Sequence, residues 1–319
     1  MLDNVIDINY YAVPQAENSN FKHRPIGLGI MGFQDALYIK KIPYASEHAV
    51  TFADESMEMV SYYAIKSSSD LAAERGAYSS YKGSLWSKGI LPLDSVELLK
   101  KERGEEFIEV DTTTRLDWEG LKKIVKKQGM RNSNVMAIAP TATIANITGL
   151  TQSIEPTYSN LFVKSNLSGE FTIINMHLVD ALKEIGMWDE VMVYDLKNLN
   201  GSLEGINRVP EELKKLFATS FEVEPKWLIE AASRRQKWID QSQSLNLYVS
   251  EPNGKKLDVM YKMAWLRGLK TTYYLRSRSA TTSEKSTITN LELNAVAANQ
   301  GSEAPEACSI LDPDCEACQ

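Results

Sequence analysis

The chain has 319 residues, of which 43% are hydrophobic and 24% charged, and its formal net charge at pH 7 is −7. This composition is typical of a soluble globular protein; it excludes a disordered or collagen-like chain, and the acidic balance argues against generic nucleic-acid binding. No apolar run of about eighteen residues predicts a membrane span, and residues 1–7 lack the pattern of a secretory signal, so we expect a cytoplasmic protein.

Residues 27–32 match the glycine pattern GxGxxG of dinucleotide-binding proteins, and Asp54 follows at about the expected distance. A dinucleotide site requires a hydrophobic strand before the first glycine, whereas residues 21–25 are charged and end in a proline. We therefore reject a dinucleotide site and interpret these glycines as positions of close packing in a barrel element.

Four helices are predicted from apolar residues spaced mostly three or four apart, each followed or closed by a glycine. Two of them begin at a capping side chain, Ser46 and Asn175. For the second helix we expect the following glycine, Gly129, to adopt the left-handed conformation. The predicted helices cover residues 46–75, 117–128, 175–185 and 256–267.

Three short runs predict strands, at residues 134–140, 170–174 and 270–275. The first is apolar and bounded by polar residues and a proline, which is typical of a strand buried on both faces of a parallel sheet or barrel. Helices that alternate with strands indicate βα units, so we expect an α/β fold. Because residues 277–319 contain no aromatic residue, we expect a globular body over residues 1–276 and a mobile tail over residues 277–319.

Small and hydroxyl-bearing residues follow the predicted strand at 134–140. Free backbone N–H groups and threonine hydroxyls at a helix start can bind an anion without lysine or arginine. The same residues also suit an ordinary turn and cap, so this pattern alone leaves both uses open. The residues concerned are Thr141, Ala142, Thr143, Ile144 and Ala145.

Two adjacent tyrosines, Tyr273 and Tyr274, lie in the predicted strand 270–275. Adjacent residues of a regular strand point to opposite faces, so the ordinary expectation is one ring in the core and one at the surface. Contact between the rings requires a local departure from regular strand geometry. Tyrosine can lose one electron together with its phenolic proton, so two stacked tyrosines could relay a radical.

All three cysteines lie near the C-terminus, and Cys315 and Cys318 form a CxxC pair downstream of Cys308. A disulfide-stapled secreted protein would spread its cysteines through the core. Structural zinc is an alternative, but it needs four ligands and the last histidine is His177, so we expect no metal. A terminal CxxC can close into a disulfide and exchange with partner proteins.

Seven sequence blocks and the CxxC tail together resemble the C-terminal part of the large, catalytic subunit of class I ribonucleotide reductase. They occur in the order of that family and are spread along essentially the whole chain. The blocks are HRPIGLG (23–29), KGILP (88–92), NSN (132–134), APTATIA (139–145), SIEP (153–156), LSGEF (167–171) and KTTYY (270–274).

The resemblance implies a fold and a role for each candidate site. The family's fold is a ten-stranded α/β barrel made of two halves of five parallel strands, so we expect the C-terminal half here. Residues 141–145 would hold the diphosphate of a ribonucleoside diphosphate substrate. Tyr273 and Tyr274 would pass a radical from the small subunit. Cys315 and Cys318 would re-reduce the active-site disulfide and take electrons from thioredoxin or glutaredoxin, whereas Cys308 receives no role.

The resemblance also implies parts that this chain does not carry. The family's thiyl cysteine, its two reducing cysteines and the main region that binds ATP or dNTP effectors precede the matched part, and the dimetal centre with its tyrosyl radical belongs to the small subunit. We therefore expect no bound cofactor, and no activity without an N-terminal half, whether the gene is split or the chain is a fragment. The alternative is a non-catalytic nucleotide-binding or regulatory half-subunit, against which the intact tyrosines and CxxC argue.

Overall fold

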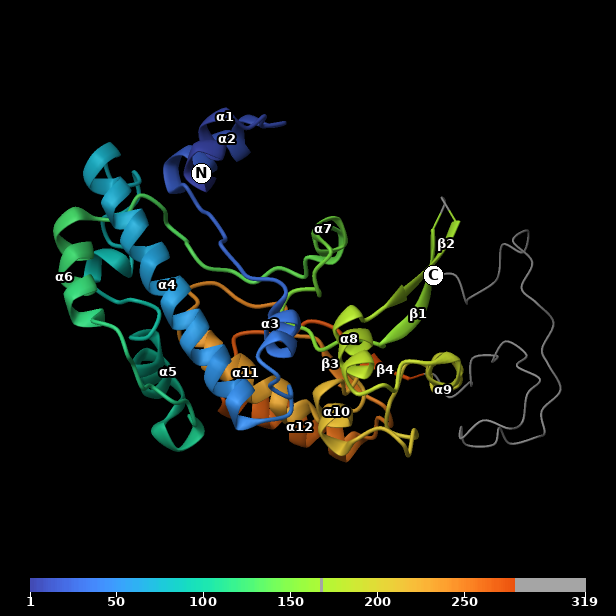
Figure 1. Ribbon diagram of the computed structural model, residues 1–319. Helices are drawn as coiled ribbons and strands as arrows, with labels where there is room; N and C mark the ends of the chain where they lie inside the picture. Colours follow the sequence, from blue (N-terminus) through green and yellow to red (C-terminus); the bar gives the residue numbers. More distant parts are fainter. Residues whose placement is uncertain (167–168, 279–319) are drawn as a thin grey trace, which may run out of the picture.

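A computed structural model describes residues 1–166 and 169–278. A long helix, α4, crosses the molecule with shorter helices beside it, and two small sheets lie to the right of it in the view of Figure 1. The N-terminal helices are α1 (Leu2–Ile8), α2 (Pro14–His23), α3 (Phe33–Ile39), α4 (Glu47–Arg75), α5 (Ser95–Arg103), α6 (Trp118–Gln128) and α7 (Ala142–Thr148), with 3-10 turns at Trp86–Lys88 and Glu105–Phe107. The remaining elements are β1 (Leu161–Asn166), β2 (Gly169–Ile174), α8 (Met176–Glu184), α9 (Glu190–Asn198), α10 (Glu211–Leu216), α11 (Pro225–Gln236), β3 (Leu247–Val249), α12 (Gly254–Leu266) and β4 (Leu275–Ser277).

The four predicted helices are confirmed as α4, α6, α8 and α12, each within two residues of the expected bounds. Side-chain caps explain all four starts: Ser46 accepts a hydrogen bond from the Ala49 N–H, Asp117 caps α6, Asn175 caps α8 and Asn253 caps α12. The prediction for Gly129 was partly wrong. Its φ of 83° is positive, but its ψ of −166° is extended, so the chain turns away from α6 without a left-handed helical residue.

The core lies mainly where α4 packs against α6 and α11, with β3 beneath α11. A second, smaller apolar cluster joins Tyr38 to α8, α9 and α10. The antiparallel hairpin β1–β2 extends from this second cluster, which confirms the strand predicted at 170–174 (Figure 1). None of the helices in the described ranges is long and apolar enough to cross a membrane.

Extended segments from distant parts of the chain lie side by side in parallel. Leu28 bridges Met136, Ile138 bridges Gln243, and β3 pairs with β4. The run predicted as a strand at 134–140 therefore has a parallel neighbour on each side, but it forms single bridges rather than a continuous strand. The Asp240 carboxylate explains this difference, because it accepts hydrogen bonds from the N–H groups of Val135 (3.0 Å) and Met136 (2.6 Å).

Two of the glycines at 27–32, Gly27 and Gly29, serve close packing, as predicted, whereas Gly32 has a left-handed backbone (φ 72°, ψ 23°) before α3. A Cβ atom placed on Gly29 would lie 2.3 Å from the carbonyl oxygen of Ala137, and one on Gly27 would lie 3.2 Å from the Cβ of Ala137. No side chain fits between these two segments at Gly29. The glycine pattern is therefore explained by the approach of two backbones rather than by a dinucleotide.

A buried ion pair ties the end of α11 to α4. Lys237 is fully buried, and its Nζ lies 3.1 Å from Asp54 and 2.8 Å from Asp111. The indole N–H of Trp238 also donates to Asp54, at 2.7 Å. Burial opposes the ionisation of Asp111, but hydrogen bonds from Lys237 and Thr113 outweigh it and hold the pKa of Asp111 at about 2. These partners make a lysine tolerable inside the core.

Candidate functional site

Residues 141–145 form the turn that opens α7. Thr141 has a left-handed backbone (φ 55°, ψ 24°), and its hydroxyl accepts a hydrogen bond from the Ser153 N–H at 2.8 Å. This bond joins the turn to the SIEP block. Ala142, Thr143 and Ile144 are exposed, and N–H groups in the first turn of a helix have no acceptor within the helix. The turn therefore presents backbone donors and the Thr143 hydroxyl to an open surface, the arrangement that an anion site requires.

The rings of Tyr273 and Tyr274 are in contact. Their centres are 4.1 Å apart, their planes meet at 47°, and the two phenolic oxygens are 3.3 Å apart. Both side chains are about half exposed, at 48% and 52%. The hydrogen bond with Tyr274 raises the pKa of Tyr273. Both phenols are thus within reach of each other and of an external partner.

An irregularity in the β3–β4 pairing places the two rings together. The Tyr273 N–H donates to the Leu245 carbonyl (2.8 Å), whereas the Leu247 N–H donates to the Tyr274 carbonyl (2.9 Å). In a regular parallel ladder both bonds would involve one residue, so this strand holds one extra residue, as in a β-bulge. The freed Tyr274 N–H donates instead to the side-chain oxygen of Asn246 at 3.0 Å. The strand predicted at 270–275 therefore becomes regular only from Leu275.

A buried acid–phenol pair lies next to this irregular pairing, and the sequence patterns did not single it out as a pair. The Tyr248 hydroxyl donates to the Glu155 carboxylate at 2.6 Å, and the two residues are 5% and 8% exposed. Burial raises the pKa of Glu155, and burial together with the Glu155 charge raises that of Tyr248. In the sequence, Glu155 could be noticed only as part of the SIEP block. Its partner Tyr248 lies 93 residues away, so no local pattern joined the two.

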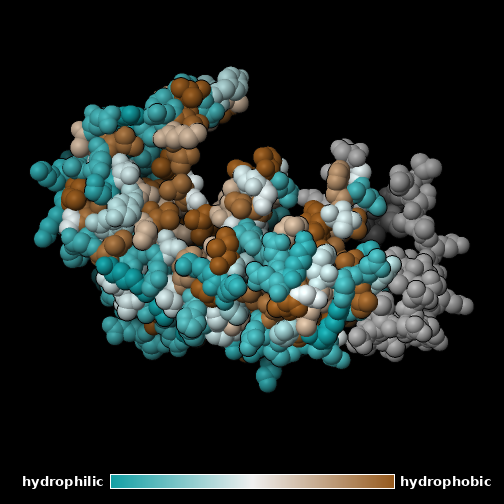
Figure 2. All heavy atoms as spheres, in the orientation of Figure 1, coloured by the Kyte–Doolittle hydropathy of each residue, from teal (hydrophilic) through white to brown (hydrophobic). Residues whose placement is uncertain are grey.

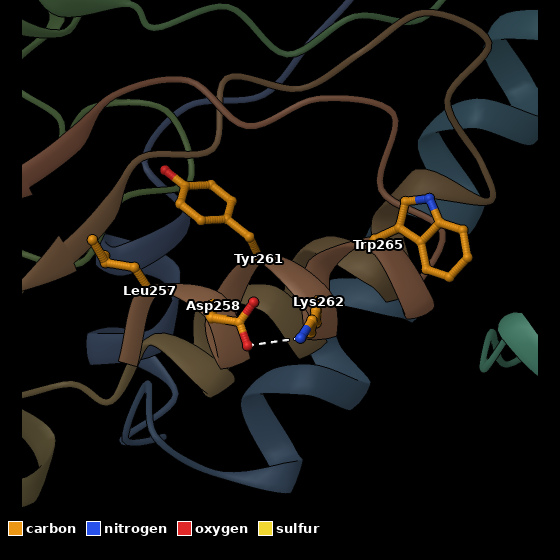
Figure 3. Close-up of a pocket in the computed structure, with 5 residues that line it drawn as sticks. All are labelled: Leu257, Asp258, Tyr261, Lys262 and Trp265. Atoms are coloured by element: carbon orange, nitrogen blue, oxygen red, sulfur yellow. Dashed lines mark hydrogen bonds and ion pairs between the residues drawn. The ribbon is translucent and has the colours of Figure 1, made fainter. Parts of the chain in front are cut away.

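Two hollows occur on the C-terminal side of the molecule. One, of about 490 Å³, lies between the start of α11, β3 and α12 and has Tyr248 in its wall. The other is a shallow hollow of about 420 Å³ along α12, where Tyr261 and Trp265 are exposed beside the ion pair of Asp258 and Lys262 (Figure 3). Neither hollow is lined by residues 141–145 or by the tyrosine pair.

Apolar side chains are exposed on the hollowed side of the molecule. Figure 2 shows them on the N-terminal helices, on α7 and in the concave region between. On α7, Ile144 is 51% and Ile147 80% exposed, and Leu150 just beyond is 43% exposed. Such a concentration beside the residues 141–145 is typical of a surface that another protein segment covers.

Within residues 1–166 and 169–278 no three or more His, Cys, Asp and Glu side chains are grouped so that they could hold a metal ion. Cys308, Cys315 and Cys318 lie outside the described residues. The candidate chemistry of the described part therefore rests on the turn at 141–145 and on the tyrosine pair.

Comparison with known proteins gives one consistent result. A family model described as "Ribonucleotide reductase, barrel domain" matches residues 1–275. The ribonucleoside-diphosphate reductase subunit alpha of Chlamydia trachomatis is 58% identical over 332 aligned residues, which cover 100% of this chain and 32% of that protein. The large subunit from Danio rerio is 43% identical, covering 87% of this chain and 34% of that protein.

A solved structure supports the same assignment of the fold. The class Id ribonucleotide reductase alpha subunit of Actinobacillus ureae superposes with a TM-score of 0.65 at 25% identity, covering 88% of this chain and 44% of the other. The chain thus spans about a third of the length of the curated relatives it matches.

Proposed function

The chain belongs to the ribonucleotide reductase large-subunit family, and from that premise we propose that it supplies the C-terminal part of a ribonucleoside-diphosphate reductase. The complete enzyme would convert ribonucleoside diphosphates to 2′-deoxyribonucleotides by radical chemistry, for DNA synthesis. Residues 1–276 would contribute the barrel portion and residues 277–319 a redox-active tail. A cytoplasmic location is part of this proposal, because the tail cysteines work only where thiols can be reduced.

The contact between Tyr273 and Tyr274 is the observation that carries the proposal. A phenoxyl radical on one tyrosine is quenched when it gains an electron and a proton, and the other tyrosine can supply both. The phenolic oxygens, 3.3 Å apart, are close enough for that proton to pass directly. The half-exposed rings suit a relay that receives its radical from a separate small subunit with a dimetal centre and tyrosyl radical.

The turn at residues 141–145 is proposed to bind the substrate diphosphate. The helix start offers backbone N–H groups, and the partial positive charge at the N-terminus of α7 favours an anion. Thr143 adds a hydroxyl on the exposed side of the turn, while the bond from the Ser153 N–H to Thr141 fixes its shape. Binding through N–H groups and hydroxyls leaves the ribose free for chemistry.

The proposed chemistry also needs groups from other segments. Residues 1–307 contain no cysteine, so a thiyl radical and the thiols that reduce the ribose must come from an N-terminal half of the large subunit. The exposed apolar side chains of α7 suit burial against that half. Cys315 and Cys318 would then restore the active-site thiols and be re-reduced by thioredoxin or glutaredoxin, and ATP or dNTP effectors would bind outside this chain.

The direct test is Tyr273→Phe in a complex of this chain, the N-terminal half and a radical-bearing small subunit. Phenylalanine keeps the packing but cannot form a neutral phenoxyl radical, so turnover should be lost while nucleotide binding is retained. Tyr63→Phe is the matched control, because Tyr63 is a similarly exposed tyrosine (56%) on α4. Normal turnover by Tyr273→Phe would refute the relay and favour the non-catalytic alternative.

A further inference from the structure

Arg276 connects the tyrosine pair to the buried acid–phenol pair. Its guanidinium carbon lies 5.2 Å from the ring centre of Tyr274. In the β3–β4 register Arg276 is the partner of Tyr248, so both side chains leave the same face of the two strands. The positive charge of Arg276 also acts on Glu155, where it opposes the rise in pKa that burial causes.

The two ends of this connection differ in burial. Glu155 and Tyr248 are nearly buried and joined by a 2.6 Å hydrogen bond, so their positions are fixed. The ring of Tyr274 is about half exposed; its hydroxyl meets that of Tyr273 at 3.3 Å, and its backbone is held by Asn246 and Leu247. A half-exposed tyrosine ring has more than one staggered side-chain conformation open to it, so keeping it against Tyr273 needs a further restraint. Arg276 is placed to supply that restraint.

We propose that Arg276 is a positioning residue for Tyr274, lying over its ring and keeping it against Tyr273 while the Glu155–Tyr248 pair, beside which Arg276 lies in the strand register, attracts the guanidinium. Its effect on turnover rests on the proposed radical relay; its effect on the ring does not. A positive charge beside Tyr274 also disfavours removal of an electron from it, so Arg276 discourages a radical from resting there.

A second arginine provides an internal comparison. Arg278 lies two residues further along and stacks over Phe221, with its guanidinium carbon 4.9 Å from the ring centre. It has the same charge, belongs to the same segment and makes the same kind of contact, but with a ring that carries no phenol. Removing each arginine in turn therefore separates a specific effect on Tyr274 from a general effect of charge at the end of β4.

The ring position can be measured in the full chain alone. Tyr274 is replaced by fluorotyrosine, and the fluorine NMR signal is compared in otherwise native chain, Arg276→Gln and Arg278→Gln. We expect Arg276→Gln to move the signal toward the frequency of free fluorotyrosine and Arg278→Gln to leave it in place. Arg276→Lys should give a signal between those of the native chain and Arg276→Gln, because lysine keeps the charge but not the planar group. Equal signals in Arg276→Gln and Arg278→Gln would overturn the proposal.

The catalytic consequence is measured in the reconstituted complex. Arg276→Gln should lower kcat by about two- to fivefold at unchanged KM, the effect of losing one exposed cation–π contact, while Arg278→Gln turns over normally. A rise in KM with unchanged kcat would contradict the proposal, because it would indicate a role in binding. If Tyr273→Phe proved active but the fluorine signal still moved in Arg276→Gln, the relay would be refuted and the positioning role of Arg276 supported.

Discussion

Replacement of Gly29 by alanine tests the close approach of the 26–28 segment to the 135–138 segment. The added Cβ would lie 2.3 Å from the Ala137 carbonyl oxygen and 3.2 Å from the Cα of Ile138. Both atoms belong to the backbone, so no flexible side chain can move aside. Two hydrogen bonds join these segments, from Leu28 to Val135 (2.8 Å) and from Ala137 to Leu28 (3.0 Å). The segments must separate, and at least one of these bonds must weaken.

The magnitude follows from these two effects. Overpacking a tight contact costs about 1–3 kcal/mol, and losing one backbone hydrogen bond adds about 0.5–1.5 kcal/mol. We therefore expect Gly29→Ala to lower the free energy of unfolding by about 2–4 kcal/mol. Gly254→Ala is the matched control: nothing lies within 4 Å of its added Cβ, and Gly254 opens α12, where alanine is favoured by about 0.4–1 kcal/mol.

The assay is urea unfolding of the full chain, followed by circular dichroism and compared with the two variants. Gly29→Ala should unfold at a clearly lower urea concentration and Gly254→Ala at the same or a higher one. If Gly29→Ala were as stable as Gly254→Ala, the two backbones could not be in the contact described here. The explanation of the glycine pattern by packing would then fail.

Three further predictions concern charge and the tail. Lys237→Met removes the fully buried cation beside Asp54 and Asp111 and leaves these carboxylates to the more exposed Arg234 and Arg115, so thermal or urea unfolding should show a loss of about 3 kcal/mol; a variant as stable as the native chain would contradict the buried ion pair. The pKa of Asp111 is lowered to about 2 from an ordinary 3.8. Its contribution to the free energy of unfolding is therefore complete above about pH 4 and falls by about 1–2 kcal/mol as the pH drops toward 2. Asp111→Asn should flatten this part of the curve of stability against pH. Cys318→Ser should abolish thioredoxin-driven turnover but spare a single round by pre-reduced enzyme, whereas equal loss in both assays would indicate a structural role.

The helices could be predicted from local patterns because the residues that start them lie next to them in the sequence. Ser46 and Asn175 lie within three residues of the N–H groups they cap, so the sequence contains both partners of the bond. The strand run at 134–140 was predicted in place but not in form. Its hydrogen bonding depends on Asp240, about a hundred residues away, which no local pattern reveals.

The candidate site, too, could be predicted from the sequence only in part. The tyrosines and the turn at 141–145 were recognisable from residue type and from the family's sequence blocks. The irregular pairing that brings the rings of Tyr273 and Tyr274 together depends on β3, which is distant in sequence. The hydrogen bond between Glu155 and Tyr248 and the contact of Arg276 with the Tyr274 ring became visible only once the fold was known. Contacts of this range are set by tertiary packing and not by local preference.

Ribonucleotide reduction by complementation tests the central claim most directly. This chain is assayed alone, and then with the N-terminal half of a large subunit and a radical-bearing small subunit, with a ribonucleoside diphosphate as substrate and a thioredoxin system as reductant. The account predicts deoxyribonucleotide formation in the full mixture only, and its loss when Tyr273→Phe replaces the native chain. Product formed by the chain alone, or a full mixture that binds nucleotide but forms no product, would contradict it.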